Sequence, residues 1–176
     1  MSKSLGNVIS PYDLVKKYGT EATRYLLLRH VHSTEDTDVT WERLDEWYTA
    51  GLVNGLGNLV ARVMKMAETY LSEPQKQTIL KERTPLNIAL AEFGFQSACN
   101  YIWFFIQQAD EKIAKEKPFD LVKTDKEQAK LKIAKSVEEV STIGQLLAPF
   151  MPETSKKILE AIKKNKKPEN LFPRLS

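Results

Sequence analysis

The chain has 176 residues, 42% of them hydrophobic, which is enough for one domain, with or without a small appendage, and a sizeable core. Its formal net charge of +3 is too small to indicate a nucleic-acid partner by itself, and its single cysteine, Cys99, excludes a disulfide framework and a multi-cysteine zinc site. No segment has the length of a membrane span or the apolar core of a signal peptide, so we expect a soluble protein with Cys99 in its core.

The chain opens on Ser2, Lys3 and Ser4, followed by Leu5-Gly6-Asn7. This is the composition of a mobile loop whose ammonium and hydroxyl groups can hold a triphosphate. Taken alone, Ser-Lys-Ser is more typical of a disordered terminus.

Preceded by one further lysine, this opening resembles the KMSKS signature loop of class I aminoacyl-tRNA synthetases. Residues 5–29 are similar to the segment that follows this loop in the enzymes for methionine, valine, isoleucine and leucine. The resemblance implies that Lys3, with Ser2 and Ser4 beside it, contacts the ATP phosphates during adenylation of the amino acid. Such catalysis stabilises charge at the reacting phosphorus and needs no covalent step by the protein.

The next elements are predicted to be short. Caps and spacing predict a helix over residues 10–18, begun by Ser10-Pro11, and a second over 20–28, capped by Thr20. Residues 30–40 are polar and predict a loop with a short strand. Thr40 is expected to cap the helix that follows.

The longest pattern runs from about residue 41 to 71 and predicts one helix with a buried apolar stripe. Asn54, Asn58 and Arg62 stand four apart on the opposite side and form a polar row suited to base edges. Glycines in this segment cost up to about 1 kcal/mol each in a helix, so we expect another helix or a ligand to approach the backbone closely. The stripe comprises Leu52, Leu56, Leu59, Val63, Met66 and Tyr70, and the glycines are Gly51, Gly55 and Gly57.

A solvated helix face is the simpler alternative for this polar row. The stretch from Leu52 to Arg62, however, is similar to one characteristic of methionyl-tRNA synthetases. The resemblance implies that Asn58 and Arg62 contact the CAU anticodon, with Asn54 beside them.

Residues 85–117 predict a helix buried on two sides, in which Trp103 and the nearby phenylalanines are core residues. Pro118 ends this helix and places Phe119 on a turn beside lysines, where an aromatic ring can stack on an unpaired base. Methionyl-tRNA synthetases have a Pro-Trp pair at the matching place, so the resemblance implies that Phe119 stacks on the anticodon with a smaller ring. The alternative is that Phe119 packs the turn onto the core.

Two last helices are predicted over residues 124–148 and 152–162, the first with an apolar face that includes Leu131. The lysines of 163–167 are interpreted as a solvated cluster that adds at most salt-sensitive phosphate attraction. Residues 171–175 resemble the short segment that closes the core of many methionyl-tRNA synthetases.

Other catalytic patterns are weak. His30 and His32 lack further clustered metal ligands and are interpreted as solvated loop residues. The acidic residues of 35–42 lack the spacing of a calcium loop. The chain contains no Gly-rich phosphate loop, nucleophile elbow or H-I-G-H motif.

The predicted fold is all-α. We expect an antiparallel α-helical bundle of the class Ia anticodon-binding type over residues 41–176. Residues 1–40 would form the end of a catalytic region, with linking helices and one small strand.

The resemblance implies part of a cytoplasmic methionine-tRNA ligase, in which this part binds the anticodon loop of methionine tRNA. The parent enzyme would use methionine and ATP with magnesium. This part alone is expected to bind no cofactor and to be inactive, because the nucleotide-binding fold, the H-I-G-H motif and any zinc site would lie upstream.

Two alternatives remain open at this point. One is the equivalent part of a valyl-, isoleucyl- or leucyl-tRNA synthetase, and the other is a non-enzymatic helical interaction module. No DNA or membrane partner is expected.

Overall fold

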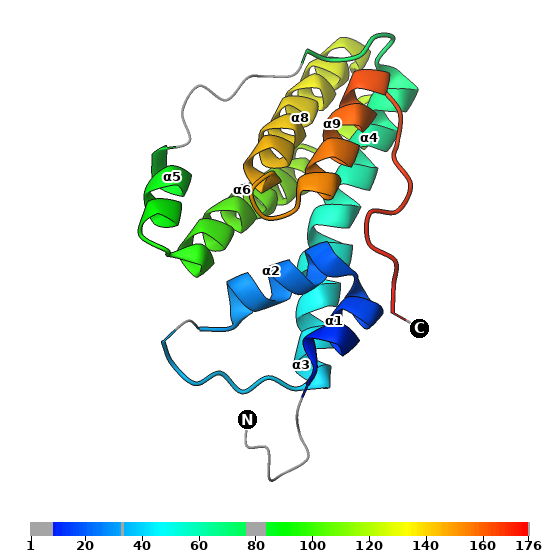
Figure 1. The fold of residues 1–176 in the computed structure, drawn as a ribbon. Coiled ribbons are helices and arrows are strands. Elements are labelled where there is room, and N and C mark those ends of the chain that lie inside the picture. The colour runs from blue at the N-terminus through cyan, green and yellow to red at the C-terminus, as the bar shows by residue number, and fades with distance from the viewer. Residues whose placement is uncertain (1–8, 33, 77–83, 176) are drawn as a thin grey trace.

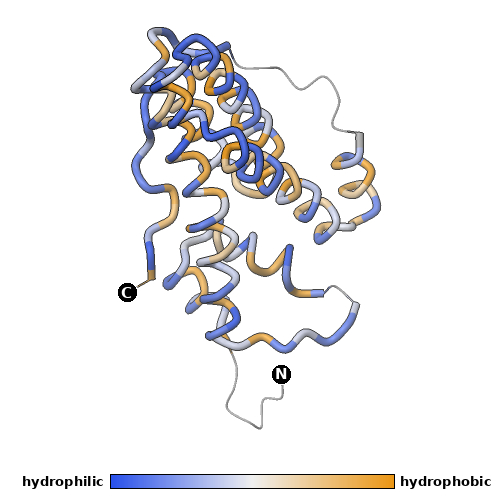
Figure 2. The backbone as a smooth tube through the Cα atoms, turned by 180° about the vertical axis from the view of Figure 1, so that it is seen from behind, coloured by the Kyte–Doolittle hydropathy of each residue, from blue (hydrophilic) through white to orange (hydrophobic). Residues whose placement is uncertain are grey.

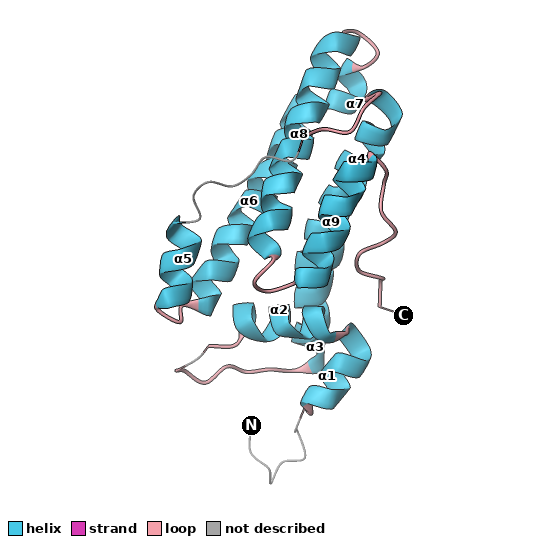
Figure 3. Ribbon diagram, turned by 45° about the horizontal axis from the view of Figure 1, so that its top comes forward, coloured by secondary structure: helices cyan, strands magenta, loops and turns pink. Residues whose placement is uncertain are grey.

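The computed structural model of the chain describes residues 9–32, 34–76 and 84–175, except for the side chain of Thr84. Within these ranges the fold is all-α, as the sequence predicts, and no strand occurs (Figure 3). The helices are α1 (Pro11–Tyr18), α2 (Thr20–His30), α3 (Trp41–Trp47), the π-helix η2 (Tyr48–Gly57), α4 (Asn58–Tyr70), α5 (Thr84–Ala91), α6 (Phe95–Glu116), α7 (Pro118–Leu121), α8 (Lys126–Leu147) and α9 (Pro152–Lys164).

The first helices begin and end largely where the caps predict. The hydroxyl of Ser10 accepts a hydrogen bond from the backbone N–H of Tyr12 at the start of α1. Thr20 is the first residue of α2 and not its cap, because Gly19, at a φ of 81°, occupies the cap position. Thr40 caps α3 by accepting from the N–H of Arg43.

The small strand predicted between α2 and α3 is absent from the described residues of that loop. Local side chains bind its backbone instead: the N–H of His32 donates to Thr37 Oγ1, and the N–H of Thr34 donates to His32 Nδ1. Such bonds compete with strand pairing, and no neighbouring strand is described for this segment to pair with.

Residues 41–70 form one continuous helical rod, but its central ten residues are a π-helix, which the sequence did not predict. A Cβ on Gly51 would lie 1.9 Å from the hydroxyl of Tyr25, so the close neighbour of this glycine is α2 and not a ligand. A Cβ on Gly57 would lie 2.9 Å from the carbonyl oxygen of Leu52. Gly51 therefore lets η2 pack closely against α2, whereas Gly57 avoids a clash with the backbone of the rod itself.

The helix predicted over 85–117 is interrupted. Glu92 to Gly94 form a turn between α5 and α6, and Phe93 has a φ of 57°. Phe104 in α6 is 56% exposed, so the prediction that the phenylalanines of this helix are core residues is wrong for Phe104. Phe104 lies two residues, or about 200°, from both buried Ile102 and buried Ile106, and therefore faces away from them.

The helix α8 shows a similar departure. Leu131, predicted to face the bundle, is 67% exposed because it lies two residues from the buried Ile133. The helix is capped by Asp125, which accepts from the N–H of Gln128, and not by Thr124.

Helices α4, α6, α8 and α9 form an elongated bundle, and α1, α2 and α3 lie at one end of it (Figure 1). Apolar residues recur along each bundle helix, whereas the loop between α2 and α3 is mostly hydrophilic (Figure 2). The predicted stripe is the core face of the rod: Leu52, Leu56, Leu59 and Val63 are fully buried.

Residues 165–175, here called the C-terminal strap, run back beside α4 after α9 ends (Figure 1). At the start of the strap, the amide of Asn165 donates to the carbonyl oxygens of Ala67 and Leu71, at 3.4 and 2.9 Å. Near its end, the hydroxyl of Tyr48 donates to the carbonyl oxygen of Pro173 at 2.8 Å. Phe172 is buried against the Tyr48 ring, so the strap closes the core as the sequence predicts.

Candidate nucleic-acid interface

The polar row predicted on residues 54–62 lies on the surface of the rod. Asn54 and Asn58 are exposed, and their amides form no hydrogen bond with any residue that the structure describes. Asn54 belongs to η2 and Asn58 begins α4, so the row crosses the end of the π-helix. Their donors and acceptors are available to a ligand.

Arg62 is the third member of this row, and it is held by a neighbour. Its Nη1 donates to Oδ1 of Asp110 on α6 at 2.8 Å. The Arg62 side chain is 35% exposed and that of Asp110 48% exposed, so the pair orients the guanidinium more than it stabilises the fold. The remaining N–H groups of Arg62 stay available, because a guanidinium carries five. Asp110 is not predictable from the sequence, since nothing in the spacing along α6 distinguishes it from other surface acids.

Arg62, Asn58 and Phe119 line one open cavity of about 430 Å³, here called the Phe119 groove. Its other lining side chains are Ala61, Lys65 and Met66 of α4 and Lys167 of the strap. Three separate segments of the chain therefore meet around three of the residues predicted as a binding site.

A second cavity of about 600 Å³, here called the strap groove, continues along the rod. Asn54 of η2 and Asn58 of α4 lie on one side of it, and residues 170–174 of the strap lie on the other side. The two grooves share Asn58, Ala61 and Lys167, so they form one path across the polar row.

Phe119 presents its ring to this path from the short helix α7, and not from a turn as predicted. Lys117 ends α6 with a φ of 43°, and Pro118 starts α7 at the position where its missing N–H costs nothing. The Phe119 side chain is 45% exposed, whereas Pro118 is buried. Pro118 therefore sets the direction of α7 and is not among the residues that line the groove.

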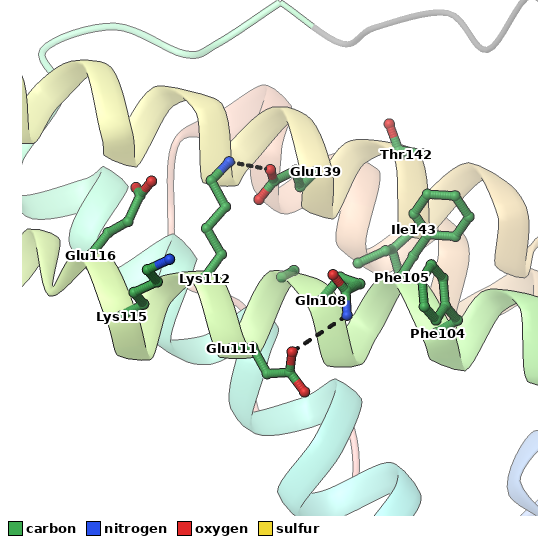
Figure 4. A pocket seen from close by; sticks show the side chains of 11 residues that line it. Phe104, Phe105, Gln108, Glu111, Lys112, Lys115, Glu116, Glu139, Thr142 and Ile143 are labelled. Carbon is green, nitrogen blue, oxygen red and sulfur yellow. Dashed lines mark hydrogen bonds and ion pairs between the residues drawn. The ribbon is translucent and has the colours of Figure 1, made fainter.

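A larger cavity, of about 720 Å³, lies between α6 and α8 (Figure 4). Phe104 and Phe105 lie at one end of it, and Lys112 and Glu139 form an ion pair across it. Acidic Glu111, Glu116 and Glu139 offset Lys112 and Lys115 in its lining. None of the described residues that were predicted as a site lines it, and its charge balance does not favour a polyanion.

The predicted phosphate-binding residues Lys3, Ser2 and Ser4 lie outside the described residues. Among the described residues no group of three or more His, Cys, Asp or Glu side chains could hold a metal ion. In the same part of the chain, no helix is long and apolar enough to cross a bilayer.

His30, predicted to be a solvated loop residue, is the last residue of α2. Its ring stacks on Trp47 at 4.5 Å between centroids and lies 3.2 Å from the hydroxyl of Tyr25. Burial, with the nearby charge of Arg29, lowers the pKa of His30 to about 4. Cys99 is a core residue as predicted, and burial raises its thiol pKa to about 12.

Comparison with known proteins agrees with this geometry. Residues 1–64 match the family model described as tRNA synthetases class I (M), and residues 89–173 match that of the anticodon binding domain of methionyl tRNA ligase. The helical bundle and these matches define the chain as part of a class I aminoacyl-tRNA synthetase.

Within that class, the relatives are specific for one amino acid. The chain is 34% identical to the methionine–tRNA ligase of Caldanaerobacter subterraneus over 92% of its own length, and 33% identical to that of Fusobacterium nucleatum over 90%. The chain belongs to the methionyl-tRNA synthetase family. It spans 28% and 27% of the length of these two relatives.

Solved structures share the fold. Methionyl-tRNA synthetase of Mycobacterium tuberculosis in complex with methionyl-adenylate superposes with a TM-score of 0.75 and 26% identity, covering 91% of this chain and 35% of that one. The free-state enzyme of the same organism superposes with a TM-score of 0.77 at 22% identity, covering 97% of this chain and 42% of that one.

Proposed function

We propose that the bundle binds the anticodon loop of methionine tRNA and that Asn58, Arg62 and Phe119 recognise its CAU anticodon, with Asn54 beside them. The observation that carries the proposal is the Phe119 groove, which brings the first three residues together from α4 and α7. The match of residues 89–173 to a methionyl anticodon-binding domain supports the same function.

The chemistry of the groove suits unpaired bases. Proteins usually read RNA sequence in loops, where bases can be splayed out and stacked on aromatic rings. Phe119 offers such a ring at an exposed position, while the free amides of Asn54 and Asn58 can donate to and accept from base edges. The Arg62 guanidinium, oriented by Asp110, adds donors that favour acceptor atoms of a base or a phosphate.

For the whole enzyme, we propose that it joins methionine to its tRNA through a methionyl-adenylate formed from ATP with magnesium, in the cytoplasm. Lys3, Ser2 and Ser4 would stabilise the phosphates during that step. The similar Mycobacterium tuberculosis enzyme was solved in complex with methionyl-adenylate, which supports this reaction. In this proposal residues 1–40 end the catalytic region, residues 41–176 form the anticodon-binding bundle, and any zinc site lies in the preceding part.

The test is binding of the chain, at low salt, to a seventeen-nucleotide hairpin with a CAU loop and to the same hairpin with a scrambled loop. We expect a preference for CAU of about tenfold, equivalent to about 1.4 kcal/mol. Arg62→Ala and Asn58→Ala should remove this preference. Arg43→Ala is the matched control, because Arg43 is exposed at the far end of the rod and pairs with Asp38. Equal binding of the two hairpins by the unaltered chain would contradict the proposal.

A further inference from the structure

We infer that Lys167 of the C-terminal strap binds the phosphate backbone of the anticodon loop, so that the strap is the second wall of the RNA site. This inference rests on the proposed function and adds a residue and a segment to it. From the sequence alone, the lysines of 163–167 are interpreted as a solvated cluster.

The position of Lys167 separates it from the rest of that cluster. It lines both the Phe119 groove and the strap groove, at the place where the two meet beside Asn58. An RNA strand that runs from one groove to the other therefore passes the ammonium group of Lys167. Lys163, four residues earlier on α9, is exposed and lines neither groove.

The charges around the path favour a polyanion. Among the residues that the structure describes, no acidic side chain lines either groove, whereas Arg62, Lys65, Lys167 and Arg174 do. Arg62 is paired with Asp110, and Lys65 lies 3.5 Å from Glu68. Lys167 forms no ion pair with any residue in the described ranges, so its charge is not already neutralised by the protein.

The geometry of a single RNA strand places its phosphates on the strap side of the path. If the bases point toward the polar row and the Phe119 ring, their sugars and phosphates are directed away from the rod. The facing wall of the path is the strap. An ammonium group there binds a phosphate as a point charge without reading sequence.

The strap is fixed firmly enough to act as a wall. Asn165 attaches its beginning to the end of α4, and the bond from Tyr48 to Pro173 attaches its end to the start of η2. Lys167 lies two residues after the first attachment, so its backbone is placed before RNA binds. Its side chain remains exposed.

The experiment compares Lys167→Ala with Lys163→Ala on the CAU and scrambled hairpins at two salt concentrations. We expect Lys167→Ala to weaken binding of both hairpins by the same factor, about fivefold at about 50 mM salt and about twofold at about 200 mM. The difference follows because one phosphate contact on a single strand contributes about −0.7 to the slope of log affinity against log salt. Lys163→Ala should change each affinity by less than about twofold.

The outcomes separate this inference from the proposed function. If the unaltered chain prefers the CAU hairpin but Lys167→Ala behaves like Lys163→Ala, the role of Lys167 is refuted and the anticodon proposal stands. If Lys167→Ala weakens only the CAU hairpin, Lys167 contacts a base and the phosphate assignment is wrong. If the unaltered chain binds both hairpins equally, the anticodon proposal itself has failed. Thermal unfolding of both variants should match the unaltered chain, since both side chains are exposed.

Discussion

Phe119 is a predicted binding residue that differs from the pattern of the family that the sequence resembles. In that family a tryptophan occupies the matching place. Stacking of a base on an aromatic ring is worth about 1–3 kcal/mol. We therefore expect Phe119→Ala to weaken binding of the CAU hairpin by at least about fivefold, and Phe119→Trp to strengthen it by about two- to threefold. Fluorescence titration with the hairpin measures both. Phe104→Ala is the control, because Phe104 is 56% exposed on α6 and lines neither groove. Unchanged affinity in Phe119→Ala would show that Phe119 only packs α7.

His30 makes folding depend on pH. Its pKa is lowered from 6.5 to about 4 in the fold, because burial disfavours the charged ring. The unfolded chain therefore binds a proton first, so the free energy of unfolding is highest above pH 6.5 and falls as the pH drops toward 4.

We expect this loss to be about 1–2 kcal/mol after allowing for partial exposure of the ring. Urea unfolding at pH 7, 5 and 4 measures it. Glutamine does not titrate, so the free energy of unfolding of His30→Gln should depend less steeply on pH than that of the unaltered chain. Parallel pH profiles for the two proteins would contradict the shift.

At the scale of elements, the close packing of η2 against α2 depends on Gly51. A Cβ there would lie 1.9 Å from the Tyr25 hydroxyl and 2.8 Å from its ring carbon Cζ. We expect Gly51→Ala to destabilise the chain by about 2–4 kcal/mol, despite the better helix propensity of alanine.

Removing the hydroxyl tests this cause. In the Tyr25→Phe background, Gly51→Ala should cost clearly less, because the nearest atom is gone while the ring carbon remains. A double-mutant cycle by urea unfolding gives the coupling energy, expected to be about 1 kcal/mol or more. Additive effects would show that the strain lies elsewhere in the rod.

Sequence patterns predicted elements better than their internal detail. Caps and apolar spacing identified α1, α3 and the stripe of the rod, because each depends on a few neighbouring residues. The π-helix was missed because apolar spacing does not distinguish it from an α-helix, and the turn at Phe93 was missed although Gly94 follows it. Which lysine of the 163–167 cluster reaches the groove depends on where the strap folds back.

The candidate site shows the same limit. Asn58, Arg62 and Phe119 were predicted, the first two on the opposite side of the rod from its apolar stripe, and the structure brings them to one cavity. Asp110 and Lys167 were not predicted. Asp110 matters through its contact with Arg62, 48 residues away in the sequence, and Lys167 reaches the groove only because of the course of the strap.

At the scale of the whole molecule, Glu21 joins the N-terminal helices to the bundle. Its carboxylate on α2 accepts from the backbone N–H groups of Glu153 and Thr154 and from the Thr154 hydroxyl, at 2.6 to 2.9 Å. These groups begin α9, whose own cap residue, Met151, supplies no side-chain bond. A carboxylate at a helix N-terminus is stabilised both by these bonds and by the helix dipole.

We expect Glu21→Gln to lower the free energy of unfolding by about 1–2 kcal/mol and Glu21→Ala by about 2–3 kcal/mol, measured by urea unfolding. Glu153→Gln is the matched control in the first turn of α9, where the loss of charge alone should cost at most about 1 kcal/mol. Equal effects of Glu21→Gln and Glu153→Gln would show that the junction depends on net charge and not on the capping bonds.

The strap also sets an order of events during translation. The α4 face of the groove is complete once residue 66 has been made, but the opposite wall is formed by residues 167–174. A nascent chain therefore folds most of its bundle before it gains the second wall. In the proposed site, the second wall therefore follows all the bundle helices in order of synthesis, and a chain stopped before residue 165 would lack the bond from Tyr48 to Pro173 that holds the strap.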